Sequence, residues 1–107
     1  MKYNNRKTTV DGITFDSKRE ARRYEILRDM EKAREIEDLR LQVPYELIPS
    51  LKDRDGKKIR GVKYVADFCY RQDGEEVVED CKGYRTDVYK LKKKLMLHVY
   101  GITIKET

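Results

Sequence analysis

Three charged residues, Asp67, Asp80 and Lys82, lie in segments that otherwise resemble apolar strands, "YVADFCY" and "EEVVEDCK". Carboxylate oxygens are the ligands that Mg²⁺ and Mn²⁺ prefer in proteins. A lysine beside such a cation can orient a nucleophilic water or stabilise charge that develops on a phosphate. These residue types favour metal-assisted attack on a phosphodiester, provided that the fold brings them together. The competing interpretation is a solvated strand face that carries a network of charges.

The turn between the two segments determines whether these residues meet. Asp73-Gly74 is a strong signal for a two-residue hairpin turn. With this pair at the tip, counting back along both strands places Asp67 opposite Asp80. Because side chains alternate between faces along a strand, Lys82 shares the face of both aspartates. This register therefore predicts that the three charges lie together.

A three-residue turn would shift the register by one and place Asp67 opposite Glu79, away from Lys82. The two-residue turn is preferred because it gathers the three charges, with Cys69 and Val78 beside them. The second face of the hairpin then carries Tyr64, Ala66, Phe68, Tyr70, Val77, Glu79 and Cys81. In this register the two cysteines lie on opposite faces and cannot form a disulfide with each other.

Two aspartates directly across a ladder have their Cβ atoms about 5 Å apart. Like charges at that distance destabilise a sheet, and partial burial increases the cost. Structure alone gives no reason for such a pair, whereas a divalent cation between the two carboxylates does. The pair therefore predicts a magnesium or manganese site at Asp67 and Asp80, with Lys82 beside it.

Composition limits the remaining possibilities. The chain has 107 residues, a charged fraction of 42% and a net charge of +5, so a single domain with a basic surface is expected. A basic balance favours an acidic partner, nucleic acid first and a membrane surface second, although a soluble surface can also be basic without such a partner. The single histidine and the two cysteines lack metal-binding spacing, which argues against a zinc site. No apolar run has transmembrane length and no signal peptide opens the chain, so a cytoplasmic protein without membrane contact is expected.

The hydrophobic pattern predicts one α/β (α+β) domain over residues 1–107, in which a central mixed sheet is flanked by helices. An αβββαβ core follows an N-terminal hairpin. Ser17 is the expected N-cap of the first helix, and Pro44 suggests an edge strand or a bulge. The second helix is expected to bury a stripe of Val88, Leu91, Leu95 and Val99, and Gly101 to end it. The expected elements are a loose segment at 1–7, a hairpin at 8–15, a helix at 16–39, strands at 39–48, 59–70 and 75–82, a helix at 87–100 and a strand at 102–105.

The paired segments "VADF" and "EDCK" resemble the motif of the PD-(D/E)xK nuclease superfamily. Asp67 corresponds to the first acid, Asp80 to the second and Lys82 to the lysine, while Ala66 replaces the usual proline, which performs no chemistry. The resemblance implies the αβββαβ core and a Mg²⁺ or Mn²⁺ cofactor. It also implies that the main-chain carbonyl of Cys81 is a further metal ligand.

Four longer segments, "DGITFDSKREARRYEIL", "YVADFCY", "VVEDCKG" and "YKLKKKLMLHVYGITI", resemble a small phage-borne family of uncharacterised proteins that are grouped with Holliday-junction resolvases. The resemblance spans about residues 10–105. It implies cleavage of branched DNA in the host-cell cytoplasm. A resolvase must cut two strands symmetrically, so a homodimer is also expected.

Glu20 has two interpretations. Many members of this superfamily carry a metal-binding acid on the first helix, and Glu20 lies there. However, Ser17 and Glu20 also fit the capping box S-x-x-E, in which the glutamate bonds back to the helix start. Both roles remain open, and they are compatible if the helix start faces the hairpin.

Two basic clusters flank the predicted site and suggest contacts with DNA phosphates on either side of the cut. They comprise Lys18, Arg19, Arg22 and Arg23 on the first helix, and Lys90, Lys93 and Lys94 on the second. A run of lysines is most often only a solvated face. The leading hypothesis is a metal-dependent DNA endonuclease. The alternatives are a non-catalytic nucleic-acid-binding module with the same fold and a basic interaction domain without a nucleic-acid role.

Overall fold

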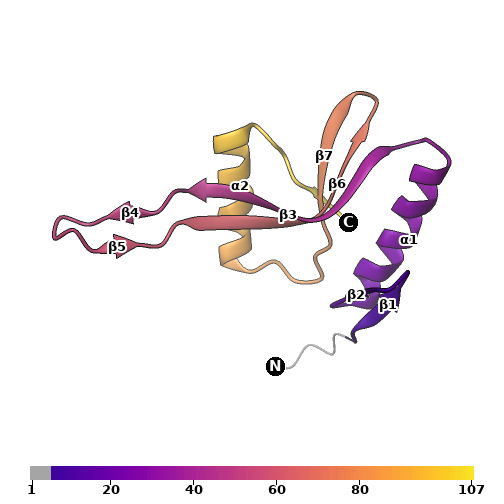
Figure 1. The fold of residues 1–107 in the computed structure, drawn as a ribbon, viewed down its shortest axis with the longest axis horizontal. Coiled ribbons are helices and arrows are strands. Elements are labelled where there is room, and N and C mark those ends of the chain that lie inside the picture. Colours follow the sequence, from indigo (N-terminus) through magenta and orange to yellow (C-terminus); the bar gives the residue numbers. More distant parts are fainter. Residues whose placement is uncertain (1–5) are drawn as a thin grey trace.

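A computed structural model of the chain describes residues 6–107, and Figure 1 shows its fold. Of the segment predicted to be loose, residues 1–5 lie outside the described part, and Arg6 and Lys7 are exposed and belong to no helix or strand. Two helices flank a four-stranded mixed sheet, which confirms the predicted α/β class. The predicted elements occur in the expected order, with two further short strands at residues 51–52 and 58–59 that were not predicted. No helix in the described part of the chain is long and apolar enough to cross a membrane.

Both predicted hairpin turns are present. Strands β1 (Thr8–Val10) and β2 (Ile13–Phe15) pair around Asp11-Gly12, and both turn residues have positive φ angles of 52° and 76°. The turn at Asp73-Gly74 has φ angles of 53° and 79°. Positive φ at both central residues matches the twist of the flanking strands, which is why Asp-Gly is favoured there.

Helix α1 (Lys18–Lys32) begins as predicted, because the Ser17 side chain caps it by accepting the main-chain N–H of Glu20. The predicted extension to residue 39 is wrong. Ala33 is the C-cap, and Arg34 takes a left-handed conformation with φ 61° that ends the helix. Ile36 continued the helical pattern in the sequence because it is buried in the same core, but it reaches that core from the connection to the next strand.

The sheet has the order β3–β6–β7–β8. Its strands are β3 (Glu37–Ile48), β6 (Val62–Gln72), β7 (Glu75–Asp80) and β8 (Lys105–Glu106). The first three strands are antiparallel, and β8 joins β7 in parallel, which makes the sheet mixed. β3 is an edge strand, as Pro44 suggested. The last strand begins three residues later than predicted and is only two residues long.

Helix α2 (Asp87–Tyr100) has the predicted bounds, with Thr86 as N-cap and Gly101 as a left-handed C-cap at φ 69°. The predicted buried stripe is wrong, because Val88, Leu91 and Val99 are exposed and Leu95 is half-buried. The buried residues are instead Tyr89 and Met96. The helix is thus turned by one residue relative to the apolar pattern, which places the tyrosine against the sheet.

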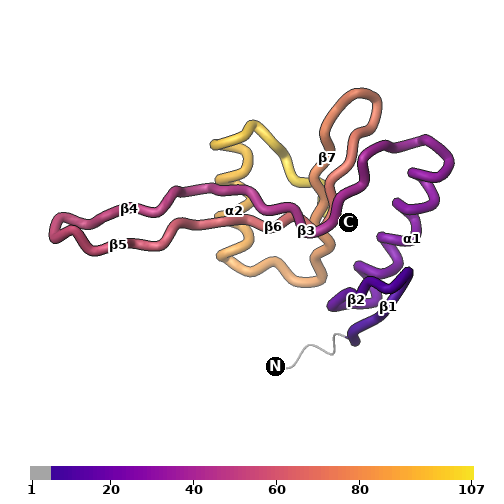
Figure 2. The backbone as a smooth tube through the Cα atoms, in the orientation of Figure 1, coloured from indigo at the N-terminus to yellow at the C-terminus, as the bar shows by residue number. Residues whose placement is uncertain are grey.

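The core has two parts, one against each helix. The two helices lie well apart along the backbone trace in Figure 2. The part against α1 includes Phe15, Leu27, Leu41, Phe68 and Tyr70, and the part against α2 includes Val43, Tyr64, Ala66, Val78 and Met96. Tyr64 and Ala66 were predicted to share a face with Phe68 and Tyr70, and this prediction is wrong. The side chains of β6 change sides at Asp67.

The change of sides coincides with an irregularity in the partner strand. Gln42 in β3, near Asp67 in β6, has a left-handed φ of 52°. Its Nε2 donates to Asp67 Oδ1 at 3.4 Å. On either side of Gln42, Leu41 packs with the α1 part of the core and Val43 with the α2 part. Asp67 therefore lies where both strands exchange faces.

Residues 49–61 form an arm that leaves the sheet between β3 and β6 and projects away from both helices (Figure 1). Within it, β4 (Leu51–Lys52) and β5 (Lys58–Ile59) pair only with each other. The arm makes the molecule elongated, with extents of 54 × 39 × 23 Å and a radius of gyration of 16.1 Å. A compact domain of this length has a radius of gyration of about 13 Å.

Candidate active site

Asp67 and Asp80 meet across the β6–β7 hairpin. The observed register pairs Cys69 with Val78 and Phe68 with Glu79, and one further step brings Asp67 opposite Asp80. This confirms the two-residue turn and its register. Asp67 Oδ2 accepts the main-chain N–H of Cys81 at 2.8 Å, which ties the first aspartate to the end of β7.

Asp80 is buried, with 2% of its surface exposed. Its Oδ2 accepts the Tyr64 hydroxyl at 2.5 Å, so one side of the carboxylate is held firmly. Its Oδ1 is also buried and has no hydrogen-bond partner. Lys82 Nζ forms an ion pair with this oxygen at 3.4 Å. Because an unpartnered buried carboxylate oxygen is costly, this atom is poised for a further ligand.

Glu20 lies within the electrostatic field of the two aspartates. Burial, followed by the charges of Asp67, Asp16 and Asp80, raises the pKa of Glu20 to about 7, although a hydrogen bond with Ser17 opposes the rise. Burial and the charge of Asp80 raise the pKa of Asp67 to about 6. The start of α1 therefore faces the hairpin, as metal binding by Glu20 requires. Ser17 at the same time accepts the main-chain N–H of Glu20, and metal binding by the Glu20 carboxylate stays a prediction.

Lys82 lies at the mouth of the site. Its Nζ is 4.7 Å from the centroid of the Tyr89 ring, a distance that favours a cation–π contact. Its main-chain carbonyl accepts Arg19 Nη1 at 2.9 Å. The ammonium group is thus placed between the carboxylate of Asp80 and the first turn of α2, while its backbone is tied to α1.

A cavity of about 300 Å³ opens at this point between β6, the end of β7 and α2. Two lysines that the sequence analysis missed, Lys63 and Lys92, contribute to its wall. The lining residues are Lys63, Tyr64, Val65, Asp67, Asp80, Lys82, Thr86, Val88, Tyr89 and Lys92. Lys92 had a usable signal, because it lies one helical turn after Val88, which the sequence placed on the inner side of this helix. Lys63 also had one, because it alternates with Val65 and Asp67 on one face of the predicted strand. Tyr64 had none, since it was predicted on the opposite face and meets Asp80 only because β6 exchanges faces at Asp67.

Glu106 on β8 fixes the segment that follows Lys82. It accepts Arg85 Nε at 3.0 Å and the Tyr89 hydroxyl at 2.8 Å, and it pairs with Lys93 Nζ at 3.3 Å. These hydrogen bonds lower the pKa of Glu106 to about 2. Lys93, which was predicted to contact nucleic acid, is thus held against β8.

The remaining predicted basic residues differ in their surroundings. Lys18 and Arg22 are exposed on α1, and Lys90 and Lys94 are exposed on α2 without lining the cavity. Arg23 is instead occupied within the protein, because its Nε and Nη2 donate to both carboxylate oxygens of Glu79 at 2.8 and 2.7 Å. The guanidinium of Arg23, which was predicted to contact DNA, is therefore engaged by Glu79 and is not free to bind a phosphate.

The donor set suits a hard divalent cation. Asp67 and Asp80 each have one oxygen in a strong hydrogen bond and keep Oδ1, which is weakly bonded in Asp67 and unpartnered in Asp80. Within residues 6–107, no three His, Cys, Asp or Glu side chains are arranged as a complete metal-binding group. Magnesium usually keeps several waters and needs only one or two protein carboxylates, so the two aspartates fit it.

The fold and cavity define a small α/β domain with a carboxylate pair and a lysine at one end of a central hairpin. The chain belongs to the family described as "Protein of unknown function (DUF1064)", which it matches over residues 1–105. No match was found among curated proteins or among solved structures.

Proposed function

We propose that the protein is a metal-dependent DNA endonuclease with selectivity for branched DNA. The observation that carries the proposal is the buried Oδ1 of Asp80, which has no hydrogen bond, is 3.4 Å from Lys82 Nζ and lies near Asp67 in an open cavity. A stable fold gains nothing from two buried like charges, whereas a cation and a phosphate together satisfy both the carboxylates and the lysine. The resemblance to PD-(D/E)xK nucleases supports the same assignment.

Each residue has a definite role in this proposal. Asp67 and Asp80 hold Mg²⁺ or Mn²⁺, with the main-chain carbonyl of Cys81 as a further ligand and Glu20 binding directly or through water. The bound cation supplies Lewis acidity and lowers the pKa of a bound water. Lys82 places its ammonium group where it neutralises charge on the phosphate. Without a cation, burial and the neighbouring aspartates raise the pKa of Glu20 to about 7, and a cation bound beside it would lower that pKa and favour the carboxylate form.

A non-catalytic binding module is the alternative, because the basic side chains around the cavity suit it equally well. The carboxylate pair argues against it, since clustered carboxylates repel phosphate when no cation lies between them. A basic interaction domain without a nucleic-acid role would show no salt-dependent binding to DNA. Four-way junctions, flaps, duplexes and single strands incubated with Mg²⁺, Mn²⁺ or EDTA separate the three functions.

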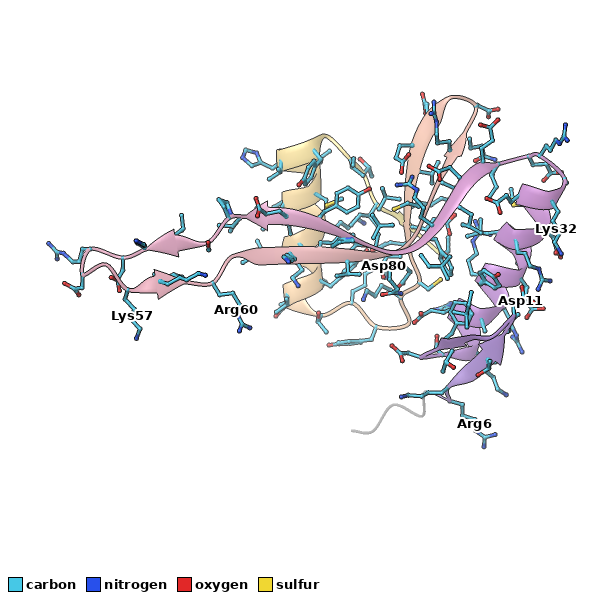
Figure 3. The ribbon with its side chains drawn as sticks, viewed as in Figure 1. Arg6, Asp11, Lys32, Lys57, Arg60 and Asp80 are labelled. Atoms are coloured by element: carbon cyan, nitrogen blue, oxygen red, sulfur yellow. The ribbon has the colours of Figure 1, made fainter. Side chains whose placement is uncertain are left out.

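Substitution of the site residues makes this experiment specific. Asp80→Asn and Lys82→Ala should each reduce Mg²⁺-dependent cleavage by about 100-fold or more, because each removes charge that acts on the reacting phosphate. Asp73→Asn and Lys32→Ala are the matched controls. Asn is favoured in the positive-φ turn that Asp73 occupies, and Lys32 lies at the far end of the molecule from the arm (Figure 3). Undiminished cleavage by either site variant would remove these residues from the mechanism.

A further inference from the structure

The arm, residues 49–61, carries most of the net charge of the chain. It contains Lys52, Arg54, Lys57, Lys58 and Arg60 against two aspartates, a balance of +3 out of the total of +5. All five basic side chains are exposed, and within residues 6–107 none of them forms an ion pair. About an eighth of the chain therefore holds a concentration of positive charge that the protein itself does not neutralise.

The two acidic residues of the arm shape its tip. Asp53 Oδ1 accepts the main-chain N–H groups of Asp55 and Lys57, both at 2.9 Å. These hydrogen bonds close the turn and leave the neighbouring basic side chains directed outwards. Figure 3 shows Lys57 and Arg60 extending from the arm on the same side in that view. The arm is thus a ribbon that displays a row of cations.

The arm does not bury its own apolar side chains. Leu51 and Ile59 are paired across it, yet they are 52% and 48% exposed. An isolated two-stranded ribbon is only marginally stable in water, so packing does not explain why it is kept. Its departure from the sheet is nevertheless fixed, because a Cβ at Gly61 would lie 2.4 Å from the carbonyl oxygen of Ile48. This close approach requires glycine and sets the path of the arm.

Lys63 joins the arm to the candidate active site. A hollow of about 460 Å³ at the root of the arm is lined by Glu46, Ile48, Ser50, Arg60, Gly61 and Lys63. Lys63 also lines the cavity that contains Asp67, Asp80 and Lys82. Basic side chains therefore continue from Lys92 and Lys82 in the cavity through Lys63 to Arg60 on the arm. A polyanion whose phosphate reaches the cavity would meet the arm next.

We propose that the arm binds duplex DNA adjacent to the point of cleavage, a role that rests on the proposed nuclease function. A strand rises about 3.3 Å per residue, so the six steps along the chain from Lys63 to Lys57 span roughly 20 Å. That length covers about six base pairs at 3.4 Å per base pair. A two-stranded ribbon also fits the width of the major groove. The preferred substrate thus carries a double-stranded stem on the arm side of the cut.

The test measures DNA binding in EDTA, where cleavage does not interfere. The arm variant is Lys57→Gln/Lys58→Gln/Arg60→Gln, and the matched control is Lys32→Gln/Arg34→Gln/Arg71→Gln, which removes the same charge from exposed residues outside the arm. Each lost phosphate contact lowers the log–log salt slope by about 0.9. The arm variant should therefore bind a 12-base-pair stem with a slope reduced by about 2 to 3, and the control should match wild type.

Stem length supplies the second measurement. Hairpin DNAs with stems of about 3, 6 and 12 base pairs carry single-stranded tails that keep the total number of phosphates equal. The difference between the arm variant and wild type should be large on the two longer stems and small on the shortest. Equal slopes for both triple variants, or a difference independent of stem length, would overturn the proposal. An arm variant that differs from wild type in its mass by light scattering but binds DNA as wild type does would also overturn the proposal. The arm would then be a self-association element.

The two proposals fail separately in these measurements. Wild-type protein that binds stems through the arm but cuts none of the DNAs in Mg²⁺ would refute the nuclease and retain the arm as a duplex-binding element. Wild-type protein that cuts DNA while the arm variant binds every stem as wild type does would retain the nuclease and refute the arm. A protein that neither binds nor cuts DNA refutes both.

Discussion

Glu79 and Asp80 are neighbours on β7, are both buried and carry the same charge, yet their surroundings are opposite. Glu79 faces α1, where Arg23 donates to both of its carboxylate oxygens and Tyr70 donates its hydroxyl to one of them. Burial alone would raise the pKa of Glu79, but the hydrogen bonds from Arg23 and Tyr70 outweigh it and lower the pKa. Asp80 faces α2 and leaves one buried oxygen without a hydrogen bond.

The difference separates a structural carboxylate from one that awaits a ligand. The Glu79 face is complete, because a guanidinium and a phenol satisfy both oxygens. The Asp80 face is incomplete, because its partners are a hydroxyl and a lysine at 3.4 Å, with Asp67 adding a second negative charge. Burial of a carboxylate is therefore no guide to its role until its partners are counted.

Exchange of a carboxylate for an amide should affect stability most at Glu79 and hardly at all at Asp80. Glu79→Gln breaks a buried ion pair and should lower the free energy of unfolding by about 3 kcal/mol. Asp80→Asn keeps an acceptor for Tyr64 and removes repulsion from Asp67, so it should leave stability in EDTA unchanged or slightly higher. Urea denaturation of both variants measures the difference. Equal losses would erase the distinction between the two faces.

A divalent cation should act on the Asp80 face alone. A ligand that binds only the folded state at a hundredfold excess over its dissociation constant stabilises that state by about 2.7 kcal/mol. Magnesium at millimolar concentration should therefore raise the melting temperature of wild type, and manganese should do so at lower concentration. Asp67→Asn should melt above wild type in EDTA and lose most of the response to metal. An Asp67→Asn protein that is less stable in EDTA yet fully responsive would make Asp67 a structural residue.

The pH dependence of stability should reveal the repulsion among the acidic residues around Asp80. The folded pKa values of Glu20 and Asp67, about 7 and 6, exceed their ordinary values of 4.5 and 3.8. The stability they contribute is thus fully present below about pH 4 and is lost as the pH rises through 6 and 7. In EDTA, Glu20→Gln should resemble wild type at pH 5 and melt above it at pH 8. Glu25→Gln, on the exposed side of α1, is the control, and a parallel profile for both variants would contradict the assigned cause.

The smallest effect is expected from the exposed lysines of α2. Lys90→Gln/Lys94→Gln should lower the log–log salt slope of duplex binding by at most about 1.8, which is two phosphate contacts. Adding Lys93→Gln should change the slope little further, because Glu106 already holds that side chain. An unchanged slope for the double variant would mean that this run of lysines is only a solvated face.

Much of the fold followed from local signals in the sequence. Asp-Gly pairs located both tight hairpins, and the predicted register after Asp73-Gly74 is observed from Gln72–Glu75 to Phe68–Glu79, one step short of the two aspartates. Thr86 and Gly101 bound α2 where its pattern predicted. These features depend on residues close in sequence, because turns and caps have specific chemistry.

The features that the sequence did not predict depend on long-range structure. The left-handed Gln42 has no signal in its own sequence, and it accompanies the change of faces that carries Tyr64 into the site. The rotation of α2, which buries Tyr89 instead of Val88, reflects the fit of a large ring against the sheet and its bond to Glu106. The charged segment around Asp53 predicted only a turn, because nothing local shows that the ribbon on either side leaves the sheet.

The edges of the main sheet have a consequence for the behaviour of the protein at high concentration. An open strand edge normally recruits strands from other molecules and seeds aggregation. On one edge, β3 carries Pro44, which lacks an N–H to donate, and the left-handed Gln42, which breaks a regular ladder. On the other edge, β8 is two residues long. The β3 edge is therefore a poor template for fibril growth, and the protein should tolerate concentration and storage better than this long exposed edge strand suggests.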